Sequence, residues 1–218
     1  MALTLYAHPF SSYCQKVLIA LWENDLPFTY KVIGEEPGLA EEHRALWPFG
    51  KFPTLVDDGQ TVAETSIIIE HLGLKHPGPV SLVPADPEAA LEVRFLDRVF
   101  DNYVMTPTQQ AVGTVLRGGG TREEAMAIAM PGLETAYAWL EDHLAGRTWA
   151  AGDSFTLADC AAAPSLFYAD WVHQIDDARF PTLRAYRSRL LARPSVARAV
   201  DGGRPYRHYF PLGAPDRD

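Results

Sequence analysis

The sequence predicts a small α/β domain followed by an all-helical domain, and three observations indicate this division. Residues 2–77 alternate short apolar runs with helical segments in the order β-α-β-α-β-β-α. A stretch rich in Pro and Gly, residues 77–87, follows as a linker. Beyond the linker, apolar residues recur only at helical spacing. We therefore expect domains at residues 1–77 and 88–200 and a tail at 201–218.

The first part opens with a strand, a helix and a second strand. The apolar run at 2–7 is typical of a buried strand. Ser11 precedes a second apolar run, and a small hydroxyl residue in that place is a helix-start signal. Residues 28–33 are rich in aromatic and β-branched side chains, which favours a strand. A short helix over 39–46 would end at Pro48.

A hairpin and a helix complete the first part. The Asp-Asp-Gly of residues 57–59 stands between the apolar runs 53–56 and 61–63, and Asp-Gly in that setting is a strong hairpin signal. Apolar residues at helical spacing predict a helix over 65–76, ended by Pro77. A parallel βαβ unit followed by a hairpin and a helix is the thioredoxin-like order.

The second part is expected to hold about five helices. Leu91, Phe95, Val99 and Tyr103 illustrate its helical spacing, and the Gly run at 118–120 breaks one helix from the next. Residues 156–159 match a capping box with Asp at its last position, which predicts the start of a central helix.

Composition excludes several classes of function. The net charge of -9 disfavours binding to a nucleic-acid backbone or to an anionic membrane surface. No apolar run is long enough to span a bilayer, and the N-terminus lacks the basic segment of a signal peptide. Cys14 and Cys160 are too few for a secreted disulfide scaffold. We therefore expect a cytoplasmic protein, and no metal site is predicted.

A set of ordered motifs resembles the cytosolic glutathione transferase family, from Leu5 to about Val200. Each motif is weak alone, but their combination and spacing are specific. The resemblance implies glutathione as co-substrate, a small hydrophobic electrophile as partner and a homodimer. The motifs are Trp47-Pro48-Phe49-Gly50-Lys51-Phe52-Pro53-Thr54-Leu55, residues 64–72, Phe155-Thr156-Leu157-Ala158-Asp159, Phe180-Pro181-Thr182-Leu183 and Ala192-Arg193-Pro194-Ser195-Val196.

Within that family, the segment from Pro9 to Leu21 is similar to the serine-type classes, such as zeta and tau. Aligning Lys16-Val17 with their basic-apolar pair places Ser11 at the catalytic serine. A free thiol has a pKa of about 8.5, and lowering it by about two units needs roughly 2.7 kcal/mol. A hydrogen bond to the thiolate supplies about 1.5–3 kcal/mol and a helix N-terminus about 0.3–1 kcal/mol. Ser12 is the alternative partner.

The resemblance also implies a set of glutathione-binding residues. Phe52 precedes what would be a cis proline, Pro53, and its backbone would pair with the cysteinyl group. Glu64 and Thr65 would hold the γ-glutamyl end through its amino and carboxylate groups. Ordinary helix capping is the alternative for this pair. Lys51 is ranked first for the glycyl carboxylate.

Other positions leave alternatives open. His43 or Arg44 would serve in place of Lys51. Trp47 stands where the family often has Asn, which leaves the local loop geometry open. Thr65 replaces the usual serine but keeps its hydroxyl. Tyr6 lies inside the first predicted strand and is expected to be a packing residue.

The remaining expectations concern the reaction itself. Cys14 is expected to be a buried apolar residue, with a redox role as its alternative. Phe10 and Tyr103 are candidate walls of the second-substrate pocket. The aromatic segment 206–211 is either a flap over that pocket or a segment packed on the first domain. Besides conjugation, a glutathione-dependent thiol or peroxide reductase, a zeta-like isomerase and a non-catalytic glutathione-binding module stay open.

Overall fold

The computed structural model describes residues 2–218, and the first part of the chain has the predicted order β-α-β-α-β-β-α. Each predicted strand and helix is present within a few residues of its expected bounds. They are β1 Leu3–Ala7, α1 Ser12–Glu23, β2 Thr29–Val32, α2 Leu39–Leu46, β3 Thr54–Asp57, β4 Gln60–Ala63 and α3 Thr65–Lys75.

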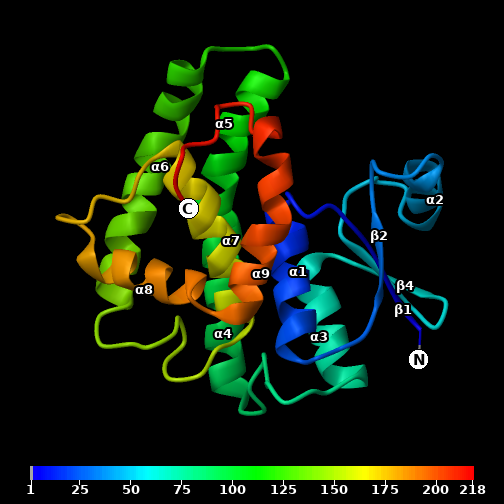
Figure 1. Ribbon diagram of the computed structural model, residues 1–218. Helices are drawn as coiled ribbons and strands as arrows, with labels where there is room; N and C mark the ends of the chain where they lie inside the picture. The colour runs from blue at the N-terminus through cyan, green and yellow to red at the C-terminus, as the bar shows by residue number, and fades with distance from the viewer. Residues whose placement is uncertain (1) are drawn as a thin grey trace.

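The four strands form one mixed sheet in the order β2-β1-β3-β4. β1 pairs parallel with β2 and antiparallel with β3, and β3 and β4 form the predicted hairpin. α1 and α3 cover one face of the sheet, whereas α2 lies on the other (Figure 1). Alternation along β1 explains this division, because Leu5 is fully buried and Tyr6 turns to α2, where its hydroxyl bonds Glu42.

The second part is all-helical, as expected. Within residues 2–218 it contains six α-helices, where about five were expected, together with a π-helical and a 3₁₀ segment. The number is hard to predict because the π-helical η1 joins α4 to α5 without a loop. The elements are α4 Pro87–Val99, η1 Phe100–Met105, α5 Thr106–Leu116, α6 Arg122–His143, α7 Leu157–Val172, α8 Pro181–Leu191, α9 Pro194–Gly203 and η2 Arg204–Tyr209.

Helix α7 forms the centre of the molecule, and all of its residues are buried. The predicted capping box begins it: the Asp159 carboxylate accepts the Thr156 backbone N–H at 2.8 Å. The same side chain accepts the Ala150 N–H at 2.9 Å and the Tyr186 hydroxyl at 2.6 Å. Asp159 therefore ties the start of α7 to the loop before it and to α8.

A buried ionic network joins the first domain to the helical domain. Lys16 on α1 is 1% exposed, and its Nζ lies 2.5 Å from Asp97 Oδ1 on α4 and 2.9 Å from Asp101 Oδ2 on η1. The Ser66 hydroxyl of α3 donates to Asp97 at 2.7 Å, and Arg98 contacts both carboxylates. Because a buried charge needs such partners, this network fixes how α4 and η1 sit on α1 and α3.

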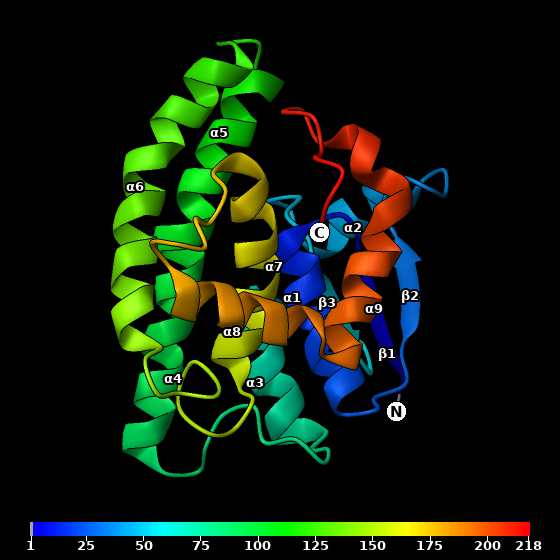
Figure 2. The same cartoon turned by 60° about the vertical axis from the view of Figure 1, so that its left-hand side comes forward.

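The chain after α9 turns back toward α7 and ends close to it (Figures 1 and 2). Arg217 reaches the buried Asp170 of α7 at 3.2 Å and its backbone carbonyl at 2.7 Å. Figure 2 also shows that α5 and α6 extend together along one side of the helical domain. Among the described residues, none of the helices combines the length and hydrophobicity that crossing a bilayer requires.

Candidate active site

Ser11 caps the N-terminus of α1, as predicted. Its backbone is extended, and its Oγ accepts the Cys14 backbone N–H at 3.4 Å. The side chain is half-buried, and its hydroxyl lies close enough to the Cys14 thiol to lower the pKa of that thiol, although the effect of burial is larger. Ser11 therefore combines a hydroxyl proton, partial shielding from water and the positive end of a helix, which is the arrangement that stabilises an anion.

Ser12 and Cys14 point into the protein. The Ser12 side chain is buried, and its hydroxyl donates to the sulfur of Met105 at 3.4 Å. Cys14 is fully buried and its sulfur accepts the His8 backbone N–H at 3.3 Å. Burial raises the pKa of Cys14 to about 12, so its thiol stays neutral at physiological pH. The buried position agrees with the packing role that the sequence favours for Cys14.

A pocket of about 500 Å³ lies beside the N-terminus of α3. It brings together five of the residues predicted to bind glutathione, which come from the loop before β3 and from the start of α3. The Phe52–Pro53 peptide bond is cis, as expected. Trp47 lines the pocket too and packs on Phe49 with ring centroids 5.0 Å apart, so an aromatic pair takes the place of an amide in this loop. The five residues are Lys51, Phe52, Pro53, Glu64 and Thr65.

Glu64 has an unusual backbone conformation, with φ of 69°. Positive φ is uncommon for a residue other than glycine and is often found at functional sites. Glu64 occupies the N-cap position of α3 without making a capping hydrogen bond, and its side chain is exposed at the pocket. Helix capping therefore does not explain why a carboxylate occupies this position. Thr65 follows as the first residue of α3 and is buried.

The far wall of this pocket is polar and was not predicted from the sequence. It is built by α4, η1 and Tyr13 of α1. Burial, with a smaller contribution from the charge of Asp101, raises the pKa of Tyr13 to about 12, so its hydroxyl remains protonated. On α4 the charges follow helical spacing and resemble an ordinary solvated face, so no sequence pattern predicts this wall. The charged and amide residues of this wall are Arg94, Asp97, Arg98, Asp101 and Asn102.

A second pocket, of about 240 Å³, lies on the other side of the start of α1. Phe10, Ser11 and Ser12 line it, so Ser12 and Tyr13, which are adjacent in the chain, face different pockets. Its other walls come from α5, from Tyr168 of α7 and from the tail. Phe10 therefore lines a pocket beside Ser11, whereas Tyr103 is 62% exposed on η1 and lines neither pocket.

The aromatic tail contacts the first domain and also lines the second pocket. Tyr206 contacts the first domain: its hydroxyl bonds Glu35, and its ring lies 4.7 Å from that of His8. Phe210 is buried with its ring centroid 5.2 Å from that of Trp171, and together with Tyr209 and Pro211 it lines the second pocket. The tail therefore packs on the first domain and also forms a wall of the pocket.

The alternatives to Lys51 lie elsewhere. His43 is buried, with its Nε2 2.9 Å from Thr54 Oγ1, and burial lowers its pKa, so it is neutral. Arg44 is exposed and lies outside the lining of both pockets. Tyr6 is likewise remote from both, since its hydroxyl bonds Glu42 at 2.6 Å on the far face of the sheet. Of the three candidate cations, Lys51 alone lines the 500 Å³ pocket.

Known proteins that are similar to this chain belong to the family that its sequence motifs resemble. The family model for the glutathione S-transferase N-terminal domain matches residues 5–80, and that for the C-terminal domain matches residues 95–194. A glutathione S-transferase-like protein, LUC7, from Fusarium sp is 31% identical over 83% of this chain and 84% of its own length. FtsZ-localized protein A of Caulobacter vibrioides is 30% identical, with 96% and 97% covered.

A probable maleylacetoacetate isomerase of Caenorhabditis elegans is 28% identical over 92% of this chain and 94% of its own length. Among solved structures, a glutathione S-transferase from Methylobacillus flagellatus with glutathione bound is 25% identical. It superposes with a TM-score of 0.78 over 91% of this chain and 98% of that one. The matches to both domain models, in this order, and the glutathione-bound structure show the family. This chain belongs to the glutathione S-transferase family and is an enzyme with glutathione as its co-substrate.

Proposed function

We propose that this enzyme is a serine-type transferase that stabilises the glutathione thiolate at Ser11 and transfers the sulfur to an apolar electrophile. The observation that carries the proposal is the position of the two pockets. They flank the first turn of α1, with Ser11 lining one and Tyr13 the other. A peptide thiol held in the first pocket would thus meet an electrophile held in the second beside the hydroxyl of Ser11.

Glutathione would lie along the 500 Å³ pocket with its γ-glutamyl end at α3. The Glu64 carboxylate would pair with the ammonium group, and the Thr65 hydroxyl with the free N–H groups of α3 would bind the carboxylate. The backbone of Phe52 would pair with the cysteinyl amide, and Lys51 would meet the glycyl carboxylate. Every charged end of the peptide then faces a group of opposite charge or a donor.

In the reaction, the thiol loses its proton to solvent and the sulfur lone pair attacks the electrophilic carbon. A new C–S bond forms, and the leaving group departs with its electron pair. Ser11 donates a hydrogen bond to the sulfur anion and takes no part as a nucleophile. The aromatic second pocket, with Phe10, Tyr168 and Phe210, favours an apolar or aromatic electrophile.

Isomerisation is a second candidate, because the isomerase relative shares nearly the whole chain. It would use the same thiolate, which adds to the substrate and leaves again after the bond isomerises. A thiol or peroxide reductase that uses Cys14 is disfavoured, because that sulfur is fully buried and neutral.

We further propose a cytoplasmic homodimer. Its support is an exposed apolar group on α3 and α4, the two helices beside the first pocket: Ile67, Leu74, Leu91 and Phe95 are each more than half exposed. Light scattering after size exclusion tests the dimer, and a monomeric mass at micromolar concentration would contradict it.

Replacing Glu64 with Gln tests the glutathione site. The charge that pairs with the ammonium group is lost, so the Kd for glutathione should rise about tenfold to a hundredfold, as expected for a charged hydrogen bond worth about 1.5–3 kcal/mol. Titration calorimetry measures the Kd, and conjugation of a chlorinated aromatic electrophile measures turnover. The control is Glu41→Gln on the exposed face of α2, which should behave as wild type. Unchanged affinity in Glu64→Gln would contradict this placement of glutathione.

Tyr209→Ala tests the second pocket. Removing one aromatic wall should raise the KM for an apolar electrophile about threefold to tenfold, equivalent to about 1 kcal/mol of lost apolar contact. The KM for glutathione should stay the same, because Tyr209 does not line the first pocket. Ile128→Ala, an exposed apolar residue of α6 outside both pockets, serves as the control. A change in the KM for glutathione alone would show that the two pockets are assigned wrongly.

A further inference from the structure

Three potential metal ligands converge at the end of the sheet remote from the N-terminus of α3. Asp57 is the last residue of β3. His71 lies in the C-terminal half of α3, and His76 directly follows the last residue of that helix. Nε2 of His71 lies 2.8 Å from Asp57 Oδ2, and Nε2 of His76 lies 2.7 Å from the same oxygen. The three ligand atoms lie within 4.8 Å of one another.

Hydrogen bonding alone leaves part of this cluster unexplained. Both imidazole rings direct Nε2 at one carboxylate oxygen, while Asp57 Oδ1 is buried and has no hydrogen-bond partner among residues 2–218. The Asp57 side chain is only 10% exposed. A buried carboxylate oxygen without a partner is costly. A cation between the three side chains, or a water molecule that the cation holds, would satisfy that oxygen.

The donor set is suited to Zn²⁺. Two imidazole nitrogens and one carboxylate oxygen form the three-ligand set of several open zinc sites, in which water occupies the fourth position. Tetrahedral Zn²⁺ with ligands at about 2.0–2.2 Å needs donor atoms about 3.3 Å apart. The two N–O separations would therefore widen by roughly half an ångström, which small rotations of the rings provide. Both rings already present Nε2, so neither needs to flip.

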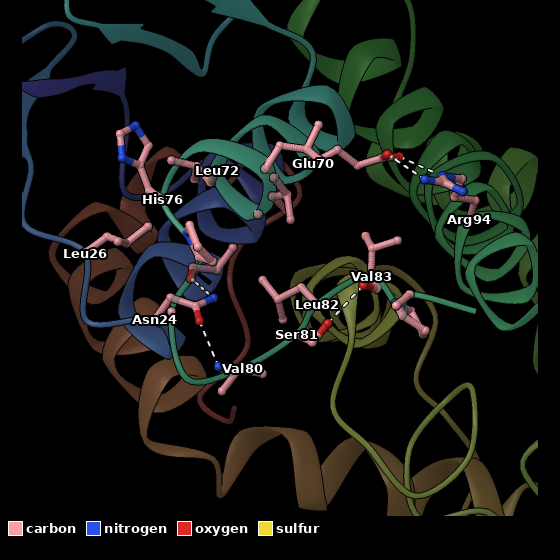
Figure 3. A pocket seen from close by; sticks show the side chains of 18 residues that line it. Asn24, Leu26, Glu70, Leu72, His76, Val80, Ser81, Leu82, Val83 and Arg94 are labelled. Atoms are coloured by element: carbon pink, nitrogen blue, oxygen red, sulfur yellow. Dashed lines mark hydrogen bonds and ion pairs between the residues drawn. The ribbon is translucent and has the colours of Figure 1, made fainter. Parts of the chain in front are cut away.

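The cluster is open to ions from one side. The His71 and His76 side chains are each 12% exposed. His76 also stands at the rim of a separate pocket of about 330 Å³ that lies under the linker. Figure 3 shows its ring directed away from Leu82 and Val83, toward the sheet. An ion would therefore reach the ligands without passing through the core.

We propose that Asp57, His71 and His76 form a Zn²⁺ site that fastens the C-terminal end of α3 to the end of β3. The site lies outside both pockets of the candidate active site, so the ion has no part in the transfer reaction. Its effect is on the helix: α3 carries Glu64 and Thr65 at its other end. The bound ion stabilises the folded chain by binding it in preference to the unfolded one.

The test uses the full chain, freed of metal with a chelator and dialysed. Titration with Zn²⁺ should show one ion per chain and a rise in the melting temperature, and Co²⁺ in its place should give the visible absorption of a four-coordinate site. His71→Gln and His76→Gln each keep a hydrogen-bond donor near Asp57 but remove a ligand. Each should weaken Zn²⁺ binding by more than about a hundredfold, because even outer-shell changes cost 10- to 100-fold.

His208→Gln, on the exposed tail, is the matched control and should bind Zn²⁺ as the wild type does. Glutathione is absent throughout, so the result is independent of the proposed transfer reaction. Lack of a saturable one-to-one Zn²⁺ complex in the wild type would overturn the proposal. Equal affinity in wild type, His71→Gln and His76→Gln would also overturn it, since the ion would then be bound elsewhere.

Discussion

Ser11→Ala is expected to lower kcat/KM for conjugation about tenfold to a hundredfold and to raise the thiol pKa of bound glutathione toward its free value of about 8.5. The reason is that the Ser11 hydroxyl, which lines the second pocket, is the group that would donate a hydrogen bond to the thiolate. The partial charge at the start of α1 remains in the variant, so some stabilisation should persist. Ultraviolet titration of the bound thiolate gives the pKa, and initial rates give kcat/KM.

Three other variants make this result specific. Ser11→Thr keeps a hydroxyl at a position where Thr is an accepted cap, so it should recover most of the activity. Ser12→Ala should leave the thiol pKa unchanged, because Ser12 is buried against Met105. Cys14→Ser should remain active, whereas a reductase mechanism requires that it be inactive. Full activity in Ser11→Ala together with an unshifted thiol pKa would contradict the role that we propose for Ser11.

Lys16→Met is expected to lower the free energy of unfolding by about 3–5 kcal/mol, the usual cost of removing one partner from a buried ion pair. Methionine has a similar length but leaves Asp97 and Asp101 facing each other, with the exposed Arg98 as the cation that remains. Urea denaturation followed by circular dichroism measures the loss. Lys31→Met is the control, because Lys31 forms an exposed pair with Glu42 and should leave the midpoint close to that of wild type.

The same network predicts acid sensitivity. Burial alone would raise the pKa of Asp97, but Lys16, Ser66 and Arg98 together hold it below its ordinary value of 3.8. A carboxyl group with a lowered folded-state pKa contributes its stabilisation fully above the unfolded pKa and loses it as the pH falls through the folded one. Wild type should therefore lose this contribution only below about pH 4, and Lys16→Met should unfold at a higher pH. Identical acid midpoints would show that Lys16 does not set the pKa of Asp97.

The sequence predicted most of the fold because its signals are local. The Asp-Gly turn before β4, the hydroxyl before α1 and the prolines near the ends of α2 and α3 each act through neighbouring residues. Glu64, Thr65 and Ser11 came from the order of motifs along the chain. Their local patterns alone are equally typical of helix caps. Their positions on the walls of two pockets are what favour the proposed binding roles over capping alone.

Other features depend on contacts between distant segments, which no local pattern contains. Lys16 looks like a surface cation at the start of a helix, yet its partners are about 80 residues later and reach it only when α4 and η1 dock. Tyr103 shares its helical spacing with Leu91 and Phe95, which suggests an inward position, but all three are more than half exposed on one outward face of α4 and η1. Asp57, His71 and His76 are likewise brought together only by the packing of α3 on the sheet.

Helix α1 lies in the middle of one continuous hydrophobic core, since it covers the sheet on one side and packs on α7 and α9 on the other. Its cation, Lys16, is neutralised by side chains from the helical domain, Asp97 and Asp101. If residues 1–80 were expressed alone, that ammonium group and the apolar face around it would be left in contact with water. The two halves therefore behave as one cooperative folding unit, and a functional chimera between relatives must inherit α1, α4 and η1 from the same parent.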